Sequence, residues 1–302
     1  TKSGSALADF NNNGKDDIVI GTDNNNLYLI HDDGLVAPGF PFSVNDKFQS
    51  APSILNINGQ KMIYIGNNDN KLYVIDGDGN LKFSILTEDK INTSPAFLNI
   101  NDNIYAFFGS KDDHIYAIDS NGIQLENWPI LLDGNVEGEV VFSDLNGSGY
   151  SEVIAATDAG SIYILNIDGS QYQYSPISNN LPFTGPSLIK DIDNDGDAEI
   201  ITGSINSLSI LDIKNPNNFI SEWSMFRGNL SRSGYYNSNV DCVVELGDAN
   251  GDTLINILDL VQIANYILNY STPEYECACD LNTDGQVNIF DLVITTNLIL
   301  EN

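Results

Sequence analysis

Short runs of apolar residues, separated by polar turns, fill most of the chain and return in a fixed order. The most regular run is five residues long and has a tyrosine or a serine at its centre. Its copies are spaced 43 to 47 residues apart and are centred on Tyr28, Tyr73, Tyr116, Tyr163 and Ser209. The runs are too short and too rich in β-branched residues for helices, so the pattern predicts β-strands.

Each repeat contains three further short runs, which gives four strands in a unit of roughly 45 residues. This pattern is typical of one blade of a β-propeller. We therefore expect a mainly β fold with about five four-stranded blades, beginning near residues 5, 50, 94, 138 and 185. Five blades can close a ring, and the sequence leaves open whether a sixth precedes Thr1.

Three of the repeats carry a loop with oxygen-bearing side chains at alternate places, and residues 191–199 are the clearest example. A tight turn at Gly196 would let these side chains wrap one cation, and Ca²⁺ takes six to eight oxygen ligands. The second and third repeats have shorter turns at Asn58 and Asn101 that lack such side chains. Loss of length and of oxygen donors together favours calcium loops over Asp/Asn-Gly turns that bind no ion.

These loops resemble the FG-GAP or VCBS-type repeats of integrin α-subunits and of many bacterial secreted proteins, over residues 4–237. The resemblance implies that the first, third, fifth and ninth side chains and the seventh carbonyl bind Ca²⁺. In order of place, the implied ligands are Asp9, Asn11, Asn13, Lys15 and Asp17; Asp144, Asn146, Ser148, Tyr150 and Glu152; and Asp191, Asp193, Asp195, Asp197 and Glu199.

A segment that begins at Trp223 follows the last repeat and contains both arginines of the chain, Arg227 and Arg232. It resembles the Trp-x-x-Phe-Arg closing segment found beside such propellers. We expect an outer strand plus a tail. In so acidic a protein, we expect the arginines to pair with carboxylates rather than to bind an anion.

The composition changes after residue 241, and two 12-residue loops follow at an interval of 32 residues. Oxygen donors stand at the first, third, fifth, seventh, ninth and twelfth places, as in a calcium loop that precedes a helix. The predicted ligands are Asp248, Asn250, Asp252, Leu254 (carbonyl), Asn256 and Asp259 in the first loop, and Asp280, Asn282, Asp284, Gln286 (carbonyl), Asn288 and Asp291 in the second. Apolar residues at helical spacing after each loop predict an amphipathic helix.

This duplicated loop and helix resembles a type I dockerin over residues 245–301. The resemblance implies folding on calcium and binding to a cohesin module. Two departures stand out. Apolar pairs, Ile257-Leu258 and Ile289-Phe290, occupy the recognition places that are often polar in the family, and Thr253 stands where glycine is usual.

The two apolar pairs also predict a contact surface. Ile257 and Ile289 fit the helical stripe and are expected in the core, whereas Leu258 and Phe290 fall one residue off the stripe and are expected to be exposed. We expect Leu258 and Phe290 to contact a cohesin-like domain or a neighbouring copy. The alternative is that they pack against the propeller of the same chain.

Composition narrows the function further. The 12 basic and 42 acidic residues give a net charge of −30, which disfavours nucleic acid and anionic membranes as partners. No run of 18 apolar residues predicts a membrane span. Three cysteines lie near the C-terminal end, and in an extracellular protein Cys242 is expected to form a disulfide with Cys277 or Cys279.

No nucleophile elbow, zinc-protease helix or phosphate-binding loop occurs, and His31 and His114 read as turn and strand-edge residues. We therefore expect an extracellular, non-catalytic binding or scaffold protein, with a propeller at 1–237 and a dockerin-like module at 238–302. The propeller could bind a glycan or a protein. Two alternatives remain: a structural subunit of an assembly or filament, and a polysaccharide-active enzyme.

Overall fold

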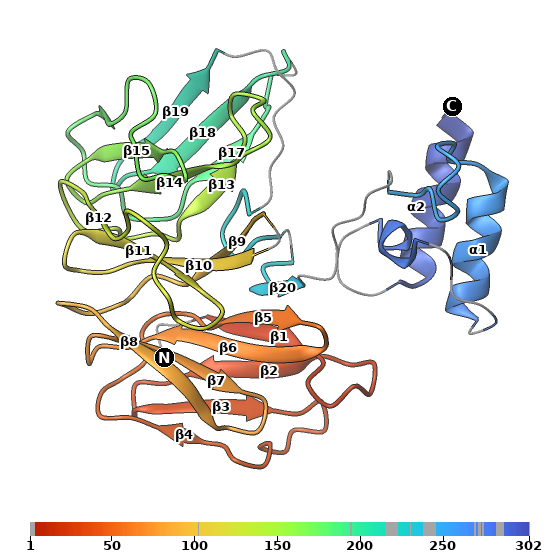
Figure 1. Cartoon of the computed structure of the whole chain (residues 1–302), viewed down its shortest axis with the longest axis horizontal. Coiled ribbons are helices and arrows are strands. Elements are labelled where there is room, and N and C mark those ends of the chain that lie inside the picture. The colour runs from red at the N-terminus through yellow and green to blue at the C-terminus, as the bar shows by residue number, and fades with distance from the viewer. Residues whose placement is uncertain are drawn as a thin grey trace. The chain divides into compact units, whose positions relative to one another are not determined.

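A computed structural model describes residues 4–301, except 102, 194, 215–222, 230, 238–245, 269, 271–272, 274 and 282–286. The chain divides into two compact units, Thr1–Tyr236 and Asn237–Asn302 (Figure 1). The first unit is built from strands and the second from two α-helices and a short 3₁₀ helix. Among the described residues, no helix is long and apolar enough to span a membrane.

The described strands of the first unit form five sheets, and each sheet is an antiparallel meander in chain order, apart from one later strand at the edge of the second sheet (Figure 1). This confirms the mainly β fold and its repeating organisation, while the closed ring of a propeller stays a prediction. The first three sheets are β1 (Ser5–Ala8), β2 (Asp17–Gly21), β3 (Asn26–Ile30) and β4 (Phe42–Ser43); β5 (Ser53–Ile57), β6 (Gln60–Gly66), β7 (Lys71–Asp76) and β8 (Leu81–Leu86); and β9 (Ala96–Ile100), β10 (Asn103–Gly109), β11 (His114–Asp119) and β12 (Ile130–Leu131). The last two are β13 (Val141–Ser143), β14 (Glu152–Ala156), β15 (Ser161–Leu165) and β16 (Ile177–Ser178); and β17 (Leu188–Lys190), β18 (Ala198–Gly203) and β19 (Leu208–Ile213).

The length of the first turn separates two kinds of sheet. In the second sheet, Ile57 pairs with Gln60 across a two-residue turn, and both turn residues, Asn58 and Gly59, have positive φ. Asn-Gly is the preferred sequence for such a turn because both positions need that conformation. In the first, fourth and fifth sheets, the candidate metal loops occupy the same place.

Consecutive sheets pack face to face. We call the face that meets the next sheet in sequence the leading face, and the face that meets the preceding sheet the trailing face. Val19 and Leu29 on the leading face of the first sheet share a core with Ile63 and Ile75 on the trailing face of the second. The same relation joins the second, third and fourth sheets in one core and the fourth and fifth in another.

Residues 223–237, the closing segment, overturn the prediction of an outer strand. Strand β20 (Tyr235–Asn237) lies beside β5, the first strand of the second sheet. Backbone amides in the first strands of four sheets donate to carbonyls of the closing segment: Leu7 to Ser233 (3.0 Å), Ile54 to Gly234 (2.7 Å), Phe142 to Trp223 (3.0 Å) and Ile189 to Ser224 (2.9 Å).

Aromatic contacts anchor the closing segment. Trp223 is 2% exposed and packs edge-on against Phe97 of β9. The segment therefore touches the first strand of all five sheets. An outer position is excluded because the segment bonds to first strands, and because the Trp223 side chain is removed from water beside them.

Arg227 is 2% exposed, so the closing segment also carries a charge into the interior. The Arg227 backbone N–H donates to the Glu139 carboxylate (2.5 Å), and its guanidinium donates to the carbonyls of Arg232 and Ser233. Burial raises the pKa of Glu139 to about 8, although the nearby Arg227 charge opposes the shift. The arginine side chains were predicted to pair with carboxylates, but the Arg227 guanidinium bonds to backbone carbonyls, and only its backbone amide reaches Glu139. Arg232 is exposed.

The second unit contains α1 (Ile257–Ile267), the 3₁₀ helix η1 (Glu276–Cys279) and α2 (Ile289–Glu301). Ile263 is fully buried and forms a small core with Ala249 and Cys279. Helix α1 begins with a capping box, in which the Asn256 side chain accepts from the backbone of the first turn and the Asp259 side chain accepts from the backbone of Asn256.

The prediction of which helix face is buried is wrong at the start of both helices. Ile257 and Ile289, expected in the core, are 66% and 57% exposed. The buried faces instead start at the closing residues of the two loops, Asp259 and Asp291, and continue at Ile263 and Thr295. An i to i+4 step defines one helical face, so a helix whose first turn must point a carboxylate inward cannot also bury the residue two places earlier.

Candidate metal centres and docking face

The loop between β17 and β18 gathers the densest group of carboxylates. Oxygen atoms of Asp191, Asp193 and Glu199 lie within 4.8 Å of one another, and those of Asp195, Asp197 and Glu199 form a second, overlapping group. Among the described residues, no other place brings three carboxylates so close. Such a group repels itself unless protons or a cation reduce the negative charge.

A lysine directly after β19 balances part of this charge. Lys214 Nζ lies 2.9 Å from Asp195 and 2.7 Å from Asp212. The hydrogen bond from Lys214 lowers the pKa of Asp195 to about 2, whereas burial and the adjacent Asp195 carboxylate raise the pKa of Asp197 to about 6. Positive charge added at this place would favour the ionised form of Asp197.

The three loops share one pattern of backbone hydrogen bonds. In all three loops the first carboxylate accepts from the amide at the sixth place: Asp9 from Gly14 (2.7 Å), Asp144 from Gly149 (2.7 Å) and Asp191 from Gly196 (3.2 Å). Asp9 and Asp144 also accept from the amide at the fifth place, of Asn13 (3.1 Å) and Ser148 (3.0 Å). The last carboxylate accepts from the amide at the second place: Asp17 from Phe10 (2.8 Å), Glu152 from Leu145 (2.8 Å) and Glu199 from Ile192 (2.7 Å). The backbone thus holds the first and last acids of each loop toward the same interior.

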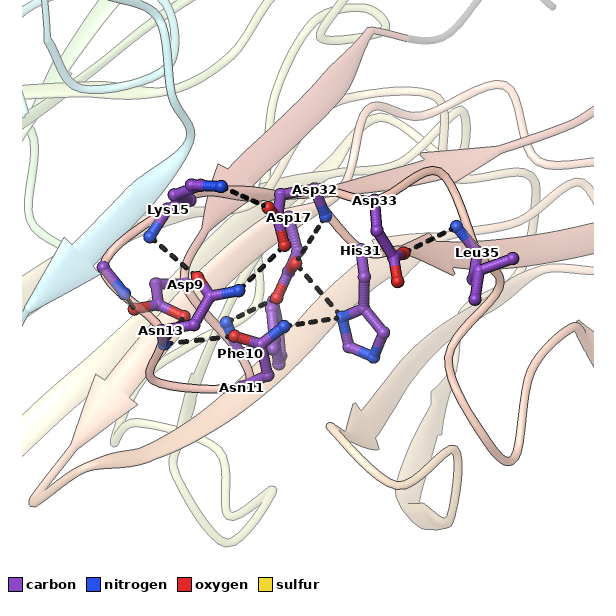
Figure 2. A network of polar contacts seen from close by, with 11 residues as sticks. Asp9, Phe10, Asn11, Asn13, Lys15, Asp17, His31, Asp32, Asp33 and Leu35 are labelled. Carbon is purple, nitrogen blue, oxygen red and sulfur yellow. Dashed lines mark hydrogen bonds and ion pairs between the residues drawn. The ribbon is translucent and has the colours of Figure 1, made fainter.

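In the first repeat, the turn after β3 extends the loop (Figure 2). Asp17 is fully buried, and its carboxylate lies 3.1 Å from His31 Nδ1 and accepts from the Asp32 amide at 3.2 Å. Asp32 in turn accepts from Asn13 (2.8 Å) and Lys15 (3.0 Å). The side chains of His31 and Asp32 therefore belong to the surroundings of this site.

The fourth-repeat loop closes on a buried acid. Glu152 is 3% exposed and accepts a hydrogen bond from the Asn146 side chain. Burial, reinforced by the charge of Asp144, raises the pKa of Glu152 to about 7. Ser148 supplies only a hydroxyl, which hydrogen-bonds to the Tyr150 carbonyl at 3.3 Å.

The first loop of the second unit repeats this geometry before a helix. Asp248 accepts from the amides of Asp252 (3.1 Å) and Thr253 (2.9 Å), and Asp259 accepts from the amides of Asn250 (3.1 Å) and Asn256 (2.9 Å). Asp248 and Asp259 are 1% and 0% exposed. Thr253 has a φ of +71°, so the residue that replaces the usual glycine does sit in the left-handed region.

The second loop is described in part. Its ninth and twelfth residues, Asn288 and Asp291, repeat the contact of the first loop, since the Asn288 amide donates to Asp291 at 2.8 Å. Asn282, Asp284 and Gln286 lie outside the described residues, as does Cys242 of the predicted disulfide. Cys279 is buried beside the Tyr275 carbonyl.

Calcium fits the described loops by the chemistry of their donors. Carboxylate, amide and hydroxyl oxygens point into turns stabilised by their own backbone, and hard oxygen ligands are what Ca²⁺ prefers. In the fifth repeat, Glu199 Oε1 and Asp197 Oδ1 are buried oxygens without a hydrogen-bond partner. A cation would satisfy buried lone pairs that otherwise have none.

A second candidate site is an apolar surface on the two helices. Leu258 and Phe290 are 59% and 67% exposed, which confirms the prediction that they are not in the core. Ile257 and Ile289 join them, and each pair is related by the interval of the duplicated loops. We call this set of four residues the docking face.

Comparison with known proteins supports the assignment of this unit. Residues 246–300 match the family described as Dockerin type I domain, which confirms the predicted dockerin module. Type I dockerins bind calcium and bind cohesin partners, so the second unit belongs to a class of modules that dock to other proteins. No curated protein gives a significant match to the chain.

Solved structures resemble the chain at low identity. A chain in the crystal structure of BBS1N in complex with ARL6DN, soaked with mercury, is 16% identical over 67% of this chain and 58% of that chain, with a TM-score of 0.49. The lead-soaked crystal gives 16% identity, 67% and 57% coverage and a TM-score of 0.46. The computationally designed Ika8 protein gives 14% identity, 65% and 55% coverage and a TM-score of 0.48. The match thus spans little more than half of each solved chain.

Three residues around the metal loops escaped sequence reasoning. His31 was expected to be a turn residue, Lys214 entered no prediction, and at Asp197 the backbone carbonyl rather than the side chain was the implied ligand. Each places a polar group against a loop carboxylate. The sequence could have indicated these contacts, because in a meander the turn after the third strand lies at the same end of the sheet as the loop between the first two strands.

Proposed function

We propose that this chain is a non-catalytic extracellular docking protein. In this proposal, a calcium-braced β-propeller displays a binding surface, and the dockerin module attaches it to a cohesin-like domain through the docking face. The observation that carries the proposal is the docking face itself, with apolar residues exposed at equal places of two helices in a dockerin module.

The exposure of these residues favours a separate partner. Isolated exposed apolar residues are common, but here two neighbouring apolar residues are exposed at the start of each of two related helices, and large exposed apolar residues that gather in this way usually mark contacts. The second unit contains no lysine or arginine but several aspartates and glutamates, so the polar surroundings of the face carry negative charge. A partner with an apolar centre and a basic rim would therefore complement the face best.

The closing segment supports the propeller arrangement. Four sheets hydrogen-bond to it through their first strands, and the remaining sheet packs on Trp223 through Phe97. Sheets whose first strands meet one common segment are arranged around an axis, which is the relation of blades in a propeller. The absence of a recognised catalytic motif in the sequence supports a binding role over an enzyme.

A direct binding experiment tests the docking role. Biolayer interferometry with an immobilised type I cohesin domain should show binding of the intact chain in calcium. The double variant Leu258→Asp with Phe290→Asp should bind at least about 100-fold more weakly, since central apolar contacts commonly contribute 2 kcal/mol or more each.

A matched control separates position from charge. Leu268 and Leu300 are 59% and 78% exposed and sit at equal places near the ends of the same two helices. The double variant Leu268→Asp with Leu300→Asp should keep wild-type binding. Equal losses in the two double variants, or none in either, would show that the docking face is not the contact surface.

A further inference from the structure

The two outermost sheets of the first unit each expose a face that every other sheet buries. On the trailing face of the first sheet, Ile18 is 42% exposed and Ile20, Tyr28 and Ile30 are half-buried. The equivalent residues of the second sheet are the same four types in the same order, namely Ile63, Ile65, Tyr73 and Ile75. Those residues are 0%, 0%, 7% and 0% exposed.

The leading face of the fifth sheet shows the same contrast. Leu208 and Ile210 of β19 are 64% and 53% exposed. Their equivalents in the fourth sheet, Ile162 and Ile164, are 3% and 1% exposed because the fifth sheet covers them. The residue types are suited to a covered face, and only the environment differs.

The order of the repeats along the chain indicates what would cover the trailing face of the first sheet. In the second to fifth sheets, the trailing face is covered by the repeat that precedes it in sequence. After β19 the chain reaches the closing segment and then the dockerin module. The trailing face of the first sheet therefore has the composition of an interface for a repeat ahead of it.

We propose that the trailing face around Ile18 binds a further repeat of the same kind, an antiparallel sheet with an apolar leading face, contributed by the same polypeptide ahead of Ser5. The proposal rests on the packing of the sheets and is independent of docking by the second unit. With one or more such repeats in place, Leu208 and Ile210 would meet the outermost added sheet when the ring closes.

An engineered extension tests this. A copy of residues 94–137, whose own sheet is covered on both faces, is joined ahead of Ser5 in the full chain. Ile18→Cys is then labelled with a thiol reagent, with peptide mapping to separate it from the native cysteines. Labelling should slow about tenfold or more in the extended chain, because the label reaches a covered face only through local opening.

Two controls make the result specific. Leu35→Cys, at a turn residue that is 66% exposed, should react equally with and without the extension. An extension whose copies of Phe107 and Ile115 are both replaced by Asp loses its apolar leading face and should give no protection. A folded, unmodified extension that leaves Ile18→Cys fully reactive would overturn the proposal.

The unextended chain distinguishes the other occupants. We expect a monomer in which Ile18→Asp changes stability little, whereas Ile63→Asp unfolds the first unit. A dimer that Ile18→Asp dissociates would mean that a second copy covers the face. A monomer that Ile18→Asp and Leu208→Asp both destabilise as strongly as Ile63→Asp would mean that the fifth sheet closes on the first. Either result overturns the proposal, and neither affects the cohesin assay.

Discussion

Replacing Trp223 by alanine should destabilise the whole first unit, although Trp223 belongs to none of its five sheets. Its ring is 2% exposed, lies 5.7 Å between centroids from Phe97 and 6.2 Å from Tyr236, and is flanked by the hydrogen bonds to Phe142 and Ile189. Removing it leaves a cavity where the first strands meet.

The size of the effect follows from burial. Replacing a buried tryptophan by alanine costs about 3–5 kcal/mol, and aromatic pairs contribute about 0.5–1.5 kcal/mol beyond area. For a unit of this size, each kcal/mol shifts Tm by about 2–4 °C, so a drop of about 6–20 °C is expected.

Urea unfolding in calcium gives the assay. Trp128 is the other tryptophan of the chain and also lies in the first unit. In the Trp223→Ala variant, tryptophan fluorescence therefore reports the unfolding of the first unit alone. Tyr174→Ala, at a side chain that is 83% exposed, is the control and should leave the midpoint unchanged.

A peripheral closing segment would give a different result. In that case Trp223→Ala would cost under about 1 kcal/mol, as surface substitutions usually do. A midpoint equal to that of Tyr174→Ala would therefore refute the central position of the segment and, with it, the main support for the propeller.

Three further outcomes are expected. Native mass spectrometry should count five calcium ions per chain, and the double variant Asp191→Asn with Asp193→Asn should bind one fewer. Chelation of calcium should abolish the helical circular dichroism signal before the fluorescence of the first unit changes, because the second unit has the smaller core. Burial raises the pKa of Glu152 to about 7 and that of Glu139 to about 8, so above pH 5 the calcium-free fold binds protons that the unfolded chain does not. The Tm of the calcium-free protein should therefore fall between about pH 5 and pH 8, and the gain in Tm on adding calcium should grow over the same range. A Tm that does not change with pH would contradict these pKa shifts. Thiol counting in denaturant without reductant should find one of three cysteines reactive, and three reactive thiols would exclude the disulfide.

Periodicity was sufficient to predict the repeated strands, because alternating residues on a packed sheet leave a direct record in the sequence. The closing segment was misplaced for the opposite reason. Its contacts join Trp223 to Phe97 and Ser233 to Leu7, pairs far apart in sequence. No local pattern distinguishes a strand at the centre from one at the rim.

The candidate sites show the same division. Spacing within a loop predicted which acids the backbone would turn inward, such as Asp9 and Asp17. It could not reveal His31, which approaches Asp17 only after the sheet has formed. For the helices, hydrophobic spacing chose Ile257 as core, but the inward Asp259 fixed the helix rotation instead.

The position of β20 also decides how the molecule would respond to tension. If the dockerin module is held by a partner while the first unit is held by its own ligand, the force enters the first unit at Asn237, at the end of β20. Load then reaches the Ser233 and Gly234 carbonyls and passes to β1 and β5 in the interior. The mechanical anchor is thus the centre of the unit, and the outer strands of the sheets bear little of the pull.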